Sequence, residues 1–515
     1  MNLFFLALPY KFYRVYMSSL IAFVVLASTG GAFAQSAPAA APADAPAAAV
    51  PPAIPPVPPP ATETPPPPPP PSPPAVDPAA FAALSAKVDE ADQNARIAGR
   101  KLELLEEQLA AKSKETPGVI ADERGFGVRS ADAAYQLRIH GLLQADSRWF
   151  LGDTSLSDRL DTFLLRRFRP AIDGTLFGIA DFRFVPDFAG GQAVIFDGYA
   201  DIHPTPYLRL RAGKFKAPLG IERLQSDADL PIIERALTQY LTPNRDIGLA
   251  LWGDIAGGIA NYNIGVYNGG FDNSNVDVDS NHAKDVVARL LIQPFKAEPL
   301  KALGSLGLHI AVSQGDRRGL PATPLLGSYK TSGQNTFFQY LAPPNDTDGT
   351  KTAFAYLTQK RINPGLFYYY GPFGVLGEAV WSQQEVRKVN TTATLTNKAV
   401  HATASVVIGG KNGYDGATPN QPLDFARGTL GALELAVRWN WLKVDDATFP
   451  NYADLTKSAS KAQGWAFGAN YVPSRPLRLA VNYERTTFTG GAGSTTAIKN
   501  RNTESLVIGR VQINF

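Results

Sequence analysis

Hydrophobic and polar residues alternate along the final stretch of the chain, residues 505–515. Val507, Gly509, Val511, Ile513 and Phe515 share one parity, and Arg510, Gln512 and Asn514 share the other. This alternation predicts a β-strand with one apolar face and one polar face. In a soluble protein the apolar face would meet a core. In an outer-membrane barrel it would meet lipid, and the polar face would line a lumen.

The same alternation recurs from Tyr135 to the end of the chain, in about sixteen predicted strands without a convincing long helix. Short connections such as 175–178, 203–206, 255–258, 371–374 and 474–476 alternate with longer polar ones: 217–244, 268–283, 315–350, 385–395, 445–461 and 489–503. A soluble β-sandwich array would explain the alternation but not this asymmetry of loop lengths. We therefore predict an all-β fold, a sixteen-stranded antiparallel transmembrane β-barrel over residues 125–515 in the bacterial cell outer membrane.

A signal peptide is predicted over residues 1–34. Lys11 and Arg14 precede the apolar run 20–27, and an Ala-x-Ala cleavage site ends at Ala34. The run is too short for a comfortable membrane-spanning helix, which is the alternative interpretation. Met17 is an alternative start of translation.

Two further segments separate the signal peptide from the barrel. Residues 35–78 consist almost entirely of Ala and Pro, which predicts a disordered, extended linker, either a passive spacer or a contact with the cell wall. Residues 79–115 place apolar side chains in steps of three and four: Phe81, Leu84, Val88, Ala91, Ala95, Ala98, Leu102, Leu105 and Leu109. This heptad pattern predicts a short α-helical coiled coil, and hence an oligomer. The alternative is a helix that packs on its own chain.

Composition excludes several classes of protein. The 515 residues contain no Cys, which excludes disulfides and thiolate metal sites, and the formal net charge of +3 gives no indication of nucleic-acid binding. The five His are scattered over the strand region, with no Ser/His/Asp arrangement and no metal-ligand spacing. We predict neither an enzyme nor a cofactor or metal site.

Arginines dominate the charged positions on the polar faces of the predicted strands. The candidate pore-lining, anion-binding residues are Arg138, Arg148, Arg166, Arg167, Arg169, Arg183, Arg209, Arg211, Arg289 and Arg438, with Arg478 and Arg510 on the same face. The inward acids are fewer: Asp146, Asp173, Asp181, Glu378, Glu434 and Glu484. An arginine fork hydrogen-bonds phosphate oxygens in pairs and keeps its charge, which favours anion passage. The alternative is that these arginines brace the wall through ion pairs.

Two long connections are candidates for a constriction of the lumen. Residues 217–244 carry Glu222, Arg223 and Arg235, and residues 315–350 carry Arg317 and Arg318. In the first connection Arg223 and Arg235 face four acids: Glu222, Asp227, Asp229 and Glu234. No dense alternating run of arginines occurs in either loop.

Several motifs resemble the phosphate-selective porin O and P family. They are Asp161-Thr-Phe-Leu-Leu-Arg-Arg-Phe-Arg169, Gly174-Thr-Leu-Phe-Gly178, Asp197-Gly-Tyr-Ala-Asp201, Gly213-Lys-Phe-Lys216, Gly220-Ile-Glu-Arg-Leu-Gln225 and Tyr368-Tyr-Tyr-Gly-Pro-Phe-Gly374. The resemblance runs from about Gly125 to Phe515. It implies a trimeric sixteen-stranded outer-membrane porin whose lumen is narrowed by inward-folded loops and lined with Arg and Lys for anions.

The residues and the resemblance together predict passive diffusion of small anions, phosphate or polyphosphate first among them. The expected partners are these anions, outer-membrane lipid and two further copies of the chain. The alternatives are a general porin for anions, organic acids or sugars, and a β-barrel that tethers the envelope.

Overall fold

The computed structural model describes residues 77–115, 117–152, 159–279, 282–297, 302–346 and 348–515. The predicted signal peptide and almost all of the predicted linker lie outside the described residues. None of the helices among the described residues is long and apolar enough to cross a membrane.

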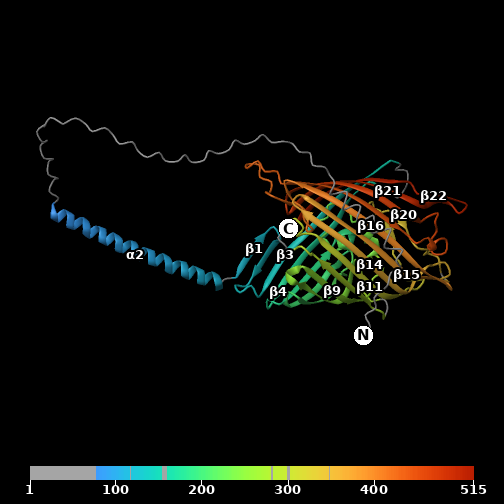
Figure 1. The fold of residues 1–515 in the computed structure, drawn as a ribbon, viewed down its shortest axis with the longest axis horizontal. Coiled ribbons are helices and arrows are strands. Elements are labelled where there is room, and N and C mark those ends of the chain that lie inside the picture. The colour runs from blue at the N-terminus through green and yellow to red at the C-terminus, as the bar shows by residue number, and fades with distance from the viewer. Residues whose placement is uncertain (1–76, 116, 153–158, 280–281, 298–301, 347) are drawn as a thin grey trace, which may run out of the picture. The chain divides into compact units, whose positions relative to one another are not determined.

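Sixteen antiparallel strands form the wall of a closed β-barrel (Figure 1). They are β3 (Gln136–Leu151), β4 (Thr162–Leu176), β5 (Ala180–Asp187), β6 (Val194–Thr205), β7 (Leu208–Lys216), β8 (Arg245–Ile255), β9 (Ala260–Tyr267), β10 (Asp285–Ile292), β11 (Gly307–Arg318), β14 (Phe354–Tyr370), β15 (Phe373–Lys388), β16 (Thr391–Ile408), β19 (Ala432–Lys443), β20 (Ala459–Ser474), β21 (Leu477–Ser494) and β23 (Glu504–Asn514). The barrel closes because β23 pairs with both β21 and β3. The predicted fold class and strand number are confirmed.

Minor elements accompany the wall. The short strands are β1 (Gly118–Asp122), β2 (Gly125–Arg129), β12 (Tyr329–Lys330), β13 (Thr336–Phe338), β17 (Gly410–Lys411), β18 (Thr418–Pro419) and β22 (Ala497–Asn500). The short helices are η1 (Ala189–Gly191), α3 (Ile221–Leu224), η2 (Leu237–Leu241), η3 (Ala256–Gly258) and η4 (Asp446–Thr448). Phe515 exchanges two backbone hydrogen bonds with Gly141, and β2 continues along the same edge of β3 beyond this point.

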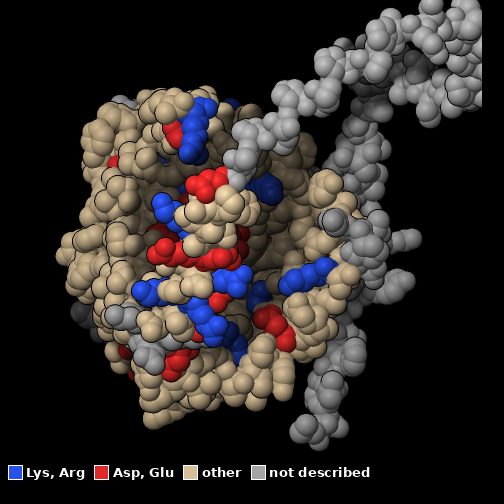
Figure 2. Space-filling model, turned by 90° about the vertical axis from the view of Figure 1, so that its left-hand side faces the viewer, with Lys and Arg blue, Asp and Glu red and all other residues tan. Residues whose placement is uncertain are grey.

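The outer face of the wall is apolar, as lipid requires. On β20, Trp465 and Phe467 are exposed, whereas Ala466 and Gly468 between and beyond them are buried on the inner side. Charged side chains are scarce on the outer wall visible in Figure 2, and they gather at its hollowed end. Period-two alternation therefore sorted the two faces as predicted.

Two predicted loop boundaries are wrong. The connection predicted at 385–395 is a tight hairpin, because β15 runs to Lys388 and β16 starts at Thr391. Strand β21 and the added strand β22 occupy much of 489–503. Conversely, residues 409–431 form a long connection on the side of the barrel where short turns were predicted.

The helix α2 (Pro78–Glu115) covers the segment predicted as a coiled coil. Phe81, Leu84 and Leu102 of the predicted seam are each at least 60% exposed in this single chain. The helix is as predicted, and its association with other copies stays a prediction.

Candidate functional site

The connection between β7 and β8, residues 217–244, folds into the barrel. Its backbone carbonyls accept hydrogen bonds from inward side chains of distant strands: Pro231 from Asn470 of β20 at 2.8 Å, and Ala228 from Gln512 of β23 at 2.9 Å. Arg510 of β23 likewise donates to the carbonyl of Ile233 at 3.0 Å. The connection is therefore attached to the wall through its main chain as well as its side chains. We call residues 217–244 the first inward segment.

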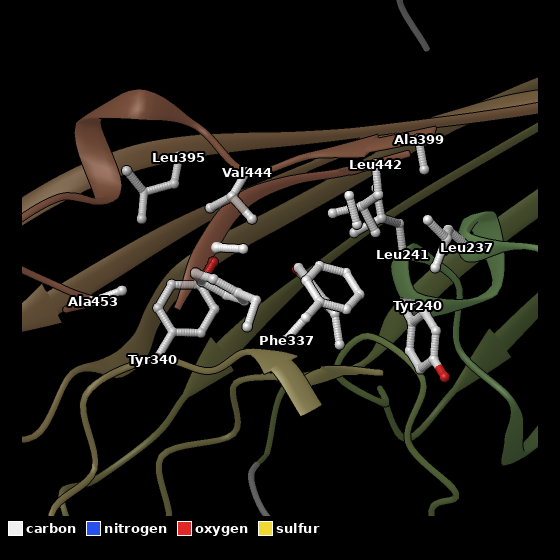
Figure 3. Packing of buried hydrophobic residues seen from close by; sticks show 14 of the residues in the cluster. Leu237, Tyr240, Leu241, Phe337, Tyr340, Leu395, Ala399, Leu442, Val444 and Ala453 are labelled. Atoms are coloured by element: carbon white, nitrogen blue, oxygen red, sulfur yellow. The ribbon is translucent and has the colours of Figure 1, made fainter. Parts of the chain in front are cut away.

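The connection between β11 and β14, residues 319–353, also folds inward and is called the second inward segment. Ser332 donates to Glu484 of β21 at 2.6 Å, and Asn335 donates to Glu504 of β23 at 2.8 Å. Figure 3 shows aromatic side chains of this segment packed with the first inward segment and with strand residues; the labelled members of this cluster are Leu237, Tyr240, Leu241, Phe337, Tyr340, Leu395, Ala399, Leu442, Val444 and Ala453. This apolar packing fills part of the barrel interior and stabilises both inward segments.

The two inward segments cover one half of the inner wall and leave the other half open. On β14–β23 the inward polar side chains are buried; examples are Asn363, His401 and Asn482, none more than 1% exposed. On β5–β10 several inward side chains are partly exposed; they include Arg183, Tyr199, Arg209, Arg211, Trp252, Asn263 and Arg289. The open part of the lumen therefore borders β5–β10.

A β-bulge in β4 turns two neighbouring arginines to the same side. The register against β3 shifts between Gln144 and Ala145, which pair with Arg167 and Leu165 and skip Arg166. Strict alternation from the inward positions Arg167 and Arg169 places Leu164 on the outer side with Phe168. The bulge makes that facing wrong for Leu164, because one extra residue reverses the parity. Arg166 and Arg167 consequently both reach the first inward segment.

Arg166 and Arg167 form ion pairs with carboxylates of the first inward segment. Glu234 lies 2.7 Å from Arg166 Nε and 2.9 Å from Arg148 Nη2. Asp227 lies 3.2 Å from Arg167 Nε and pairs also with Arg169 and Arg235. Burial would raise the pKa of the Asp227 carboxyl, but Arg167, Arg235 and Arg169 outweigh it and hold the pKa well below its usual range.

Nine of the ten arginines predicted to line the pore form ion pairs. The pairs are Arg138–Asp122, Arg148–Glu234, Arg166–Glu234, Arg167–Asp227, Arg169–Asp187, Arg183–Asp173, Arg209–Asp181, Arg211–Asp201 and Arg438–Glu222. Arg289 instead donates to the amide oxygen of Asn261 at 2.7 Å. All ten face inward, and most of them also brace the wall or hold the first inward segment.

Three basic side chains near the open half form no ion pair with any described residue. Besides Arg289, Lys216 donates to the backbone carbonyls of Leu224 and Gln225. Arg223 donates to the side-chain oxygen of Asn273 at 2.7 Å. Burial, with Arg235 and Arg245 nearby, lowers the pKa of Arg223 to about 9, which leaves it cationic at neutral pH.

The assignment of Arg317 and Arg318 to a constriction loop is wrong. Both belong to β11, which extends to Arg318. Arg317 faces inward, is buried and pairs with Asp285 at 2.5 Å, whereas Arg318 is exposed on the opposite parity. The sequence Gln-Gly-Asp-Arg-Arg at 314–318 is polar throughout, which is typical of a loop. It stays in the sheet because its backbone pairs with β14, and local composition does not reveal such pairing.

Besides Lys216, sequence reasoning missed two contributors to the site. Arg245 of β8 packs its guanidinium 3.4 Å from the ring centroid of Phe196 and pairs with Asp197. Tyr414 of the 409–431 connection donates to the carbonyl of Ile221 at 2.7 Å, so a connection from the other end of the barrel meets the first inward segment. Arg245 opens a strand after Pro243-Asn244, a boundary signal that could have identified it. No local signal marks Tyr414.

No group of three or more His, Cys, Asp or Glu suited to a metal ion occurs in the described part of the chain. The site is instead a partly open, water-accessible lumen with paired and unpaired basic side chains along one side. Such an arrangement can attract and pass anions, because the charges that line a pore decide its selectivity.

Comparison with known proteins adds to this geometry. A family model described as phosphate-selective porin O and P matches residues 137–515. A search of curated proteins finds no match. Among solved structures, the outer membrane channel DcaP of Acinetobacter baumannii has 14% identity and a TM-score of 0.47, over 76% of this chain and 99% of that one. An anion-selective porin from Comamonas acidovorans has 11% identity and a TM-score of 0.47, over 74% of this chain and 100% of that one.

Proposed function

Since the chain belongs to the phosphate-selective porin O and P family and is an outer-membrane porin, we propose that its lumen lets small anions diffuse passively, phosphate or polyphosphate first among them. The observation that carries this proposal is the set of basic side chains beside the open half of the lumen. Lys216, Arg223 and Arg289 lack carboxylate partners among the described residues, and the guanidinium groups of the two arginines stay charged at neutral pH. The field of the two arginines raises the local concentration of anions and opposes the entry of cations.

Solute passage needs sites that bind weakly and release quickly. The paired arginines Arg183, Arg209 and Arg211 are partly exposed, and their carboxylate partners reduce the positive field each one presents. A row of such moderated sites suits transport better than a single deep pocket would.

A general anion porin without phosphate selectivity is the second candidate. Glu222, Asp227 and Glu234 pair with most of the arginines around the first inward segment. These acids would repel a doubly charged phosphate more than a singly charged chloride, which favours broad anion selectivity.

We further propose the arrangement of the N-terminal segments: a signal peptide at 1–34, a linker at 35–78 and a trimerising coiled coil at 79–115. The exposed apolar seam of α2 supports the last of these, because association of three helices would remove it from water.

The proposal is tested by conductance of the purified protein in a planar bilayer, with the reversal potential measured under a KCl gradient and phosphate then added. We expect anion selectivity and block of the chloride current by phosphate. Arg289→Gln should lower the ratio of anion to cation permeability, whereas Lys457→Gln, an exposed change in the connection between β19 and β20, should not. Anion selectivity without phosphate block would support the general porin, and cation selectivity would refute both.

A further inference from the structure

Four inward side chains form a lateral row across β7–β10, called the inner row: Arg209, Trp252, Asn263 and Arg289. The sheet register pairs Arg209 with Trp252, Trp252 with Asn263, and Asn263 with Arg289. Three strand spacings separate the ends of the row, which makes it roughly 14 Å long. All four side chains are partly exposed and lie in the half of the wall that the inward segments leave open.

The inner row has an aromatic ring between two arginines, of which one is paired with carboxylates and the other with none that the structure describes. The guanidinium of Arg209 lies 4.3 Å from the Trp252 ring centroid, and its charge is shared with Asp181 and Asp201. Arg289 at the other end forms no ion pair within the described residues. The row therefore presents an uncompensated cation about two strand spacings from an indole.

Three side-chain atoms of the inner row lack a hydrogen-bond partner in the part of the chain that the structure describes. The indole Nε1 of Trp252, the side-chain oxygen of Asn263 and the Nε of Arg289 have no hydrogen-bond partner among the described residues. These three atoms are buried, and buried polar atoms normally have partners, so the row gains hydrogen bonds when its side chains move to meet a polar solute.

We infer that the inner row is a solute subsite that prefers anions carrying an aromatic ring. The anionic group contacts Arg289, and the ring packs against Trp252. This inference rests on the proposed anion passage and names a class of solute within it. The backbones at Trp252 and Arg289 lie two strand spacings apart, roughly 10 Å, and the long indole and guanidinium side chains reach inward to shorten the span that a benzene ring joined to a phosphonate or carboxylate must cover.

The chemistry of the row separates this class from others. Arginine alone binds any phosphonate or carboxylate, because its fork matches their oxygens. The indole adds stacking and apolar contact that only an aromatic solute returns. A neutral sugar would use the indole but not the unpaired cation.

The test compares block of the KCl current by phenylphosphonate and by methylphosphonate, which carry the same anionic group. We expect phenylphosphonate to block the wild-type channel at a concentration about three- to tenfold lower, the range that one aromatic contact supplies. Trp252→Leu should bring the two concentrations together. Trp465→Leu, a change on the outer face of β20, should leave the difference intact. Arg289→Gln should weaken block by both phosphonates.

Equal block by the two phosphonates in the wild-type channel would overturn the inference without any variant. A difference that persists in Trp252→Leu would overturn it as well. If the wild-type channel is anion-selective in KCl while either result is found, the inner row fails as an aromatic subsite and the proposed anion porin stands. A cation-selective wild-type channel would refute both the aromatic subsite and the proposed anion porin.

Discussion

Replacing Glu234 by glutamine would test how the first inward segment is held in the lumen. The Glu234 carboxylate lies 2.7 Å from Arg166, 2.9 Å from Arg148 and 3.7 Å from Arg510. Arg148 and Arg510 are almost fully buried, whereas the Arg166 side chain is 26% exposed and its pair is partly screened by water. The glutamine side chain would keep the shape and lose the charge that compensates these cations.

Breaking a buried ion pair by removing one partner costs about 3–5 kcal/mol, because a charge is left buried and uncompensated. Arg510 keeps Asp146 at 2.7 Å, so we expect Glu234→Gln to cost about 3 kcal/mol, at the low end of that range. The loss should appear in the free energy of unfolding measured by urea denaturation of the folded barrel in detergent. The same variant should show larger single-channel conductance, because the segment is less firmly attached, and stronger anion selectivity, because one negative charge is gone.

Protonation of Glu234 in acid should reproduce the loss of stability expected for Glu234→Gln. Burial would raise the pKa of Glu234, but Arg166, Arg148 and Arg167 outweigh it and lower the pKa below its ordinary value of 4.5. A carboxyl with a lowered folded-state pKa contributes stability above its unfolded pKa and loses that contribution as the pH falls further. Glu123→Gln, an exposed change in the turn between β1 and β2, is the matched control. A Glu234→Gln barrel with unchanged stability and unchanged conductance would refute the ion-pair attachment.

Three further outcomes are expected. Phe337→Ala should lower the free energy of unfolding in urea by about 3–5 kcal/mol, because removal of this fully buried ring leaves a cavity. Phe467→Ala on the outer face should cost less, and equal losses would contradict the packing. Burial, with the acid Asp415 nearby, raises the pKa of Asp229 to about 6 against the opposing effect of Arg478, Arg475 and Lys216. Stability and anion selectivity should therefore both rise as the pH falls from 7 to 5, and reversal potentials of Asp229→Asn should be flat over that range. Tyr414→Phe removes one hydrogen bond to the first inward segment and should cost about 0.5–1.5 kcal/mol in the same urea assay, an effect absent if the two segments do not meet.

The wall of the barrel could be predicted from the sequence because its two faces meet different environments, lipid outside and water inside. Lipid on one side and water on the other sort every second residue, so positions such as Val511 and Arg438 fall on the predicted sides. Facing failed where an extra residue interrupts the period, at Leu164, because alternation carries no record of a bulge. Strand ends failed where polar residues remain paired, as at Arg317, because backbone pairing depends on the neighbouring strand and not on local composition.

The inside of the barrel was less predictable, because its contacts join residues far apart in the sequence. Counting arginines on inward faces indicated a strongly basic lumen, but carboxylates of the first inward segment pair with several of these arginines, among them Arg148, Arg166, Arg167 and Arg438. The sequence does not encode the path of that segment locally. Selectivity must therefore be argued from what stays unpaired after folding. Lys216, Arg223 and Arg289 remain, and of these only Arg289 was among the predicted pore-lining residues. The proposed anion preference of this porin thus depends less on the number of its arginines than on which basic side chains the folded loops leave without an acid.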